Sequence, residues 1–215
     1  MPYLTKRTIE EQAQQLIERY YQQEVGTLRE PIDADGILEL QLGYDLVIED
    51  LKQCFGKDGV LGATASNEKL VYIDSSLDTP ESLGRYRFTL AHEIGHIVLH
   101  IPPPSDTVQL SLLDDVSQQP TPLFRCGEGE LKVTSNFSPI EWQANYFASC
   151  LLMPKQRVMN AITYFRKEPS VTKNQPLAEQ YSVVSMMATH FQVSYEAMTY
   201  RIQKLEPPVA SLDLK

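Results

Sequence analysis

The stretch FTLAHEIGHIVLH, residues 88–100, constrains this chain most, because it holds three of the four histidines within nine positions. An α-helix turns by about 100° per residue, so His92 and His96 leave the same face one turn apart and can share one ion. Glu93 lies beside them, close enough to take a proton from a bound water. Apolar residues at positions 90, 94, 97 and 101 form a separate stripe that predicts a core-facing side. The stretch therefore predicts a zinc-binding helix of the hydrolytic type.

His100 does not complete this site. It lies eight residues beyond His92, which is about 12 Å along a helix axis, too far for both to bind one ion. A metal site of the HExxHxxGxxH type is also excluded, because position 102 is a proline. We expect His100 to support the site from outside the ligand set or to pack in the core. A buried helix with merely structural histidines is the plain alternative, but a chance HExxH occurs in only about one chain in a few hundred at ordinary residue frequencies.

A third ligand has to come from elsewhere in the chain. Glu141 opens a second predicted helix, SPIEWQANYFASCLLMP, and Asn145 falls on the same face, where it could orient a ligand. Glu141 is also the N3 residue of a capping box whose N-cap is Ser138, a role that needs no metal. Spacing alone leaves both roles open. Five acidic residues of the intervening loop are less well placed: Asp106, Asp114, Asp115, Glu128 and Glu130.

The rest of the pattern predicts an α+β fold. We expect a helix over 8–24 capped by Thr8, and a short helix that ends at Gly43. Glycines then punctuate a small antiparallel sheet over about 45–74, with a hairpin feeding the strand LVYID. Further helices are expected over 81–100, 138–153, 154–166 and, as a helix–turn–helix pair, 177–205. Residues 102–137 have little periodicity and predict a long loop, which could cover the site.

Charge and composition narrow the function. The net charge of −9 argues against a generic binder of nucleic acid or anionic membranes. The three cysteines are far apart and form no CxxC pair, so they predict neither a cysteine zinc site nor a disulfide framework. The first residues have no apolar core, and no apolar run is long enough to span a membrane, so we expect a cytoplasmic protein. No pattern in the chain indicates an oligomeric state.

RFTLAHEIGHIVLH followed by EWQANYFASCLLMP resembles the ImmA/IrrE family of metallo-endopeptidases. LVYIDSSL and FQVSYEAMTYRIQKL are similar to that family too, so the resemblance covers roughly residues 5–205. It implies that His92, His96 and Glu141 bind zinc and that Glu93 is catalytic. It also implies a zincin-like domain over 1–166, a helical segment over 167–206 packed on it, and a tail over 207–215. Family members cleave a partner helix-turn-helix repressor, which makes such a protein the expected substrate.

Other functions stay open at this point. The 177–205 segment could belong to a regulatory module that binds DNA or protein around a structural or vestigial zinc, although it lacks the basic surface of a DNA reader. A zinc hydrolase of small amides or cell-wall peptides is a third alternative. For a peptidase, LVYID could be an exposed sheet edge that pairs with the substrate. Candidates for the group that stabilises the oxyanion are Tyr72, Tyr86 and His190.

Overall fold

The computed structural model describes residues 4–25, 30–56, 59–101, 123–127, 138–165 and 183–205, and these form an α+β fold, as predicted. The helices are α1 (Lys6–Tyr20), α2 (Ala34–Gly36), α3 (Leu51–Phe55), α4 (Leu83–His100), α5 (Pro139–Leu152), α6 (Lys155–Phe165), α7 (Val183–Phe191) and α8 (Tyr195–Lys204). The strands are β1 (Asp45–Glu49), β2 (Val60–Ala65), β3 (Leu70–Asp74) and β4 (Leu123–Gly127). Short π-helical turns follow α1 (Tyr21–Val25) and α2 (Ile37–Gln41), and short 3₁₀ turns (Ser75–Leu77 and Pro80–Ser82) lead into α4.

The sheet has the strand order β1-β3-β2-β4. It is mixed, whereas the sequence predicted an antiparallel sheet, and that prediction is wrong for one pair of strands. β2 pairs antiparallel with both β3 and β4, whereas β1 pairs parallel with β3, Asp45 opposite Leu70. The reason lies in the connections. The chain leaves β1 through α3 and enters β2 two places away, and the hairpin then returns β3 into the gap, in the direction of β1.

The predicted hairpin is confirmed, but its second strand is not an edge. The turn between β2 and β3 closes with a hydrogen bond from the Lys69 amide to the Ser66 carbonyl, and Lys69 adopts a positive φ of 53°. Because β3 pairs on both sides, its backbone groups are used within the sheet. The expectation that LVYID pairs with a substrate is therefore wrong. Gly62, one of the glycines that punctuate this segment of the sequence, lies inside β2.

α1 buries the apolar residues that its periodicity predicts: Ile9, Ala13, Leu16, Ile17 and Tyr20. It begins one turn earlier than expected, because Thr5 rather than Thr8 is the N-cap. The Thr5 hydroxyl accepts a hydrogen bond from the Thr8 amide at 3.2 Å.

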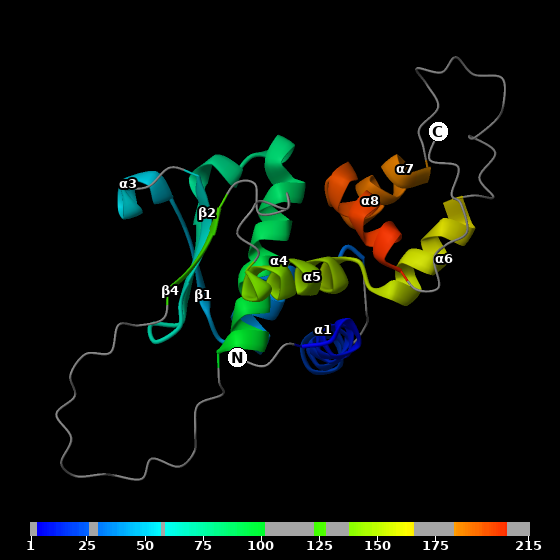
Figure 1. The fold of residues 1–215 in the computed structure, drawn as a ribbon, viewed down its shortest axis with the longest axis horizontal. Coiled ribbons are helices and arrows are strands. Elements are labelled where there is room, and N and C mark those ends of the chain that lie inside the picture. Colours follow the sequence, from blue (N-terminus) through cyan, green and yellow to red (C-terminus); the bar gives the residue numbers. More distant parts are fainter. Residues whose placement is uncertain are drawn as a thin grey trace, which may run out of the picture.

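α4 lies between the sheet on one side and α5 on the other (Figure 1). Its contact with α5 is close because Gly95 has no side chain. A methyl group there would lie 3.1 Å from both the Cα atom and the carbonyl oxygen of Ala144. The helix is buried nearly all round, so its histidine face lies inside the protein and not on an open surface.

The C-terminal helices pack into the same apolar core as the rest of the described chain. Ser194 caps α8, as predicted, by accepting a hydrogen bond from the Ala197 amide. Arg201 on α8 donates to Glu10 on α1 at 2.9 Å and to the Met153 carbonyl after α5 at 2.9 Å. The boundaries predicted at 166 and 206, and the tail over 207–215, fall outside the described residues and stay predictions. So does the structure of most of the 102–137 loop.

None of the helices in the described ranges combines the length and the apolarity needed to cross a membrane.

Candidate metal centre

Two buried histidines on α4 face each other as the helical spacing predicts. The Nε2 atoms of His92 and His96 are 2.9 Å apart, and both side chains are fully buried. A pair of ring nitrogens this close has to share either a proton or a cation. The identity of that shared species depends on which nitrogens carry hydrogen.

Glu141 reaches this pair from the first turn of α5. Its Oε2 lies 3.1 Å from His92 Nε2 and 3.4 Å from His96 Nε2. Only the backbone half of the capping box is present, since the Glu141 amide donates to Ser138 Oγ at 3.5 Å while the carboxylate points to the histidines. Within the described residues, His92, His96 and Glu141 form a cluster that could hold a metal ion.

Asn145 fixes the proton of the first histidine. It lies one turn after Glu141 on α5, and its side-chain oxygen is 3.0 Å from His92 Nδ1. An amide oxygen only accepts hydrogen bonds, so Nδ1 of His92 carries the hydrogen. Nε2 of His92 is therefore left with a lone pair directed at the cluster.

A two-step chain fixes the second histidine in the same way. The side-chain oxygen of Gln143 lies 3.3 Å from His100 Nε2, so that nitrogen is the donor and His100 Nδ1 is an acceptor. His100 Nδ1 lies 3.1 Å from His96 Nδ1, which then donates. Nε2 of His96 is again left with a lone pair. His100 thus contacts a cluster histidine without joining the cluster, and Gln143 is a contributor that the sequence pattern did not indicate.

The three converging lone pairs fit a cation. Ligand atoms around a tetrahedral zinc, at about 2.0–2.1 Å from it, lie roughly 3.3–3.4 Å apart. The separations here are 2.9, 3.1 and 3.4 Å. Burial lowers the pKa of His96 to about 4, so its ring is neutral at pH 7, the form that binds a metal.

Glu93 is fully buried beside this cluster, at the contact between α4 and β2. The hydroxyl group of Thr64 donates a hydrogen bond to Glu93 Oε2 at 2.7 Å. Gly62, two residues earlier on the same face of β2, lies against the other oxygen. A methyl group there would be 2.7 Å from Glu93 Oε1. The strand therefore contributes a donor and an unfilled space to the carboxylate, neither of which the sequence pattern indicated.

Residues 134–203 match the sequence model of the IrrE N-terminal-like domain, a peptidase family. This match supports the resemblance of the chain to the ImmA/IrrE family. The match begins just before α5 and ends within α8, so it includes Glu141, Gln143 and Asn145 but not α4. No curated protein matches the chain. The family match points to a metallopeptidase, and hence to a protein substrate.

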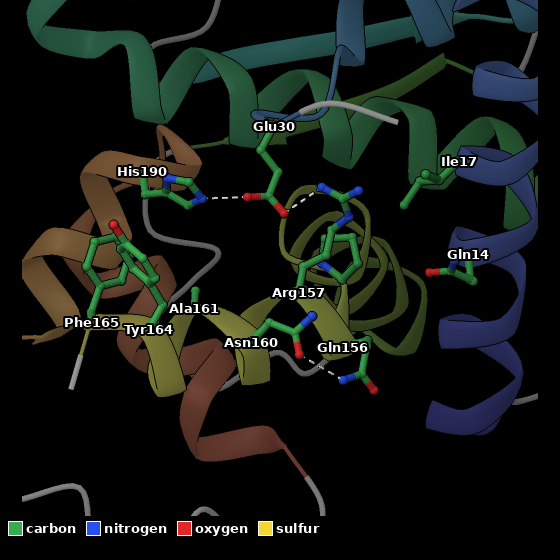
Figure 2. Close-up of a pocket in the computed structure, with 11 residues that line it drawn as sticks. Gln14, Ile17, Glu30, Gln156, Arg157, Asn160, Ala161, Tyr164, Phe165 and His190 are labelled. Carbon is green, nitrogen blue, oxygen red and sulfur yellow. Dashed lines mark hydrogen bonds and ion pairs between the residues drawn. The ribbon is translucent and has the colours of Figure 1, made fainter. Parts of the chain in front are cut away.

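The three residues proposed from sequence to stabilise an oxyanion make contacts elsewhere in the structure. Tyr72 pairs with Ala63 on β2, so it lies on the sheet face opposite Thr64 and packs on Phe55. The Tyr86 hydroxyl contacts Asp35. His190 pairs with Glu30 in a cavity between α1, α6 and α7 (Figure 2). The five acidic loop residues from Asp106 to Glu130 lie outside the described residues.

Proposed function

We propose that the chain is a zinc-dependent endopeptidase with a zincin-like fold, in which His92, His96 and Glu141 bind the metal. The observation that carries the proposal is the convergence of two histidine lone pairs and one carboxylate oxygen within 3.4 Å of each other. Two histidines and one glutamate are a ligand set of catalytic zinc, which keeps its remaining position for water or substrate.

Glu93 is the general base in this proposal. A zinc ion held by His92, His96 and Glu141 would lower the pKa of a bound water and polarise the scissile carbonyl group. Glu93 follows His92 directly in the chain, and its carboxylate is buried and held by Thr64. Such a carboxylate can take a proton at the attacking oxygen and return it to the leaving amine. Asn145 and His100 keep the two histidines in the tautomers that the site needs.

We further propose that the substrate is a helix-turn-helix repressor, whose cleavage derepresses mobile-element or stress genes. This part is supported by the match to a peptidase family, which points to a protein substrate. An extended segment of such a substrate would pair with β4, which ends the described sheet next to β2 and Glu93.

Co-expression with the helix-turn-helix regulator encoded nearest to this gene tests the enzyme and its substrate together. We expect the regulator to be cleaved by the wild-type chain and to stay intact with Glu93→Gln, which keeps the metal ligands. Cleavage by Glu93→Gln at the wild-type rate would refute the proposed base. An intact regulator in both strains would refute the proposed substrate.

The positions of the basic side chains on α8 do not favour the alternative of a DNA-binding module. Arg201, one of the two basic residues of α8 along with Lys204, has a side chain that is 1% exposed and pairs with Glu10. It is therefore unavailable to a phosphate group. A sequence-selective, salt-sensitive complex with duplex DNA would restore this alternative.

A further inference from the structure

Thr64 on β2 is the side chain that holds the base of the proposed reaction. Its hydroxyl lies 2.7 Å from Glu93 Oε2, and both side chains are fully buried. The two residues are 29 positions apart in the chain and come from different elements. This contact therefore exists only because β2 packs on α4.

The hydroxyl group of Thr64 is the donor of this hydrogen bond, and Glu93 Oε2 is the acceptor. A hydrogen bond from a hydroxyl group to a carboxylate is short and strong compared with one between neutral groups. Because both side chains are buried, it also restricts rotation of the Glu93 side chain, since leaving this contact would cost a buried hydrogen bond.

Gly62 completes the fit around the carboxylate. Residues 62 and 64 point to the same face of β2, and any side chain at 62 would occupy the space of Glu93 Oε1 and of the Thr89 methyl group, at 2.7 and 2.8 Å. The strand thus binds one oxygen and leaves room for the other. This combination places the carboxylate in one orientation next to His92 and His96.

We propose that Thr64 is a positioning residue: its hydroxyl group fixes the orientation of Glu93 for proton transfer, without binding the metal or the substrate. The inference rests on the proposed peptidase function for its effect on rate. The pairing of Thr64 with Glu93 itself does not depend on that function.

Thr64→Val tests the inference, because valine keeps the shape and removes the donor. In the zinc-loaded full chain, with the cleaved regulator as substrate, we expect kcat to fall about 10- to 100-fold, since a misplaced catalytic group costs rates of this order. KM and the affinity for cobalt, followed by its visible absorption, should stay within about twofold. Thr64→Ser should restore kcat to within a few-fold of the wild type. Thr89→Val, a matched loss of a hydroxyl group at the same contact of β2 with α4, should leave kcat unchanged.

Three outcomes would overturn the role: an unchanged kcat in Thr64→Val, a Thr64→Ser variant as slow as Thr64→Val, or a loss of cobalt affinity parallel to the loss of rate. A double-mutant cycle of Thr64→Val with Glu93→Leu, which removes the acceptor, is measured by chemical denaturation of the metal-free chain and decides the pairing without any activity. Non-additive changes in stability support it, and additive changes refute it. If the wild-type chain cleaves nothing while the cycle shows coupling, the peptidase proposal fails and the pairing stands.

Discussion

At the scale of single residues, the candidate metal centre depends on side chains that hold its histidines as much as on the histidines themselves. Asn145 and Gln143 each direct a lone pair into the cluster, one directly and one through His100. Such outer contacts raise the affinity of a site because they fix the tautomer and the ring orientation of the ligand. Their contribution can be measured by removing one amide oxygen.

Gln143→Leu should weaken zinc binding by about 10- to 100-fold, because His100 then loses the contact that makes its Nδ1 an acceptor for His96. A competition titration with a chromogenic chelator measures this affinity. Gln156→Leu, on the surface of α6, is the control and should bind zinc as the wild type does. Equal affinities for Gln143→Leu and the wild type would show that the chain of contacts does not support the site.

At the scale of elements, the distance between α4 and α5 sets the distance between the histidines and Glu141. Gly95 permits that distance, since a methyl group would meet the backbone of Ala144 at 3.1 Å. Gly95→Ala gains helix propensity, about 1 kcal/mol, but overpacks a buried contact, which costs about 1–3 kcal/mol. We expect a lower free energy of unfolding in urea and a weaker affinity for zinc. A variant that is more stable and binds zinc normally would contradict the close contact.

Arg201 ties three elements together, because it contacts Glu10 on α1, Cys150 on α5 and the carbonyl group of Met153. Arg201→Met removes the buried partner of an ion pair whose other partner, Glu10, is 27% exposed. We therefore expect a loss of about 2–4 kcal/mol in the free energy of unfolding. This is slightly less than the cost of breaking a fully buried ion pair. Arg19→Met, at an exposed position of α1, should change it by less than about 0.5 kcal/mol. Similar small changes in both variants would contradict a structural role for Arg201.

The elements also show which parts of the fold a sequence can predict. Helical periodicity located α1, α4 and α5 well, because each carries a run of apolar residues with one spacing. It missed the first turn of α1, where Lys6 and Arg7 are polar and do not contribute to the pattern. It also missed the parallel pairing of β1 with β3, since no local feature of a strand specifies a neighbour 25 residues away in register (Asp45 opposite Leu70).

The residues of the candidate site also differ in how far the sequence predicts them. His92, Glu93 and His96 were found because one helix carries them at a fixed spacing. Glu141 needed the family resemblance, since its capping position explained it equally well. Thr64, Gly62 and Gln143 were missed because their contacts join separate elements. Gly62 and Thr64 are two residues apart, so a strand would place both on one face. No sequence feature indicates that Glu93 packs against that face.

At the scale of the whole molecule, the metal site joins the sheet side of the protein to its helical side. α4 packs on β2 through Glu93 and on α5 through Gly95, so an ion held between α4 and α5 should stabilise the entire core. Binding that is restricted to the folded state adds about 2.7 kcal/mol at a ligand concentration one hundred times the Kd. We expect Tm to rise with zinc, and to fall to the metal-free value after chelation with the fold retained. A Tm that is independent of zinc would contradict this coupling.

The most direct test of the central claim is a comparison of metal binding by the wild-type chain, Glu141→Gln and Glu93→Gln, each titrated with zinc after complete removal of metals. We predict one tightly bound ion per chain for the wild type and for Glu93→Gln, and a large loss of affinity for Glu141→Gln. Tight binding of one ion by Glu141→Gln, or no binding by the wild type, would contradict a metal centre made of His92, His96 and Glu141.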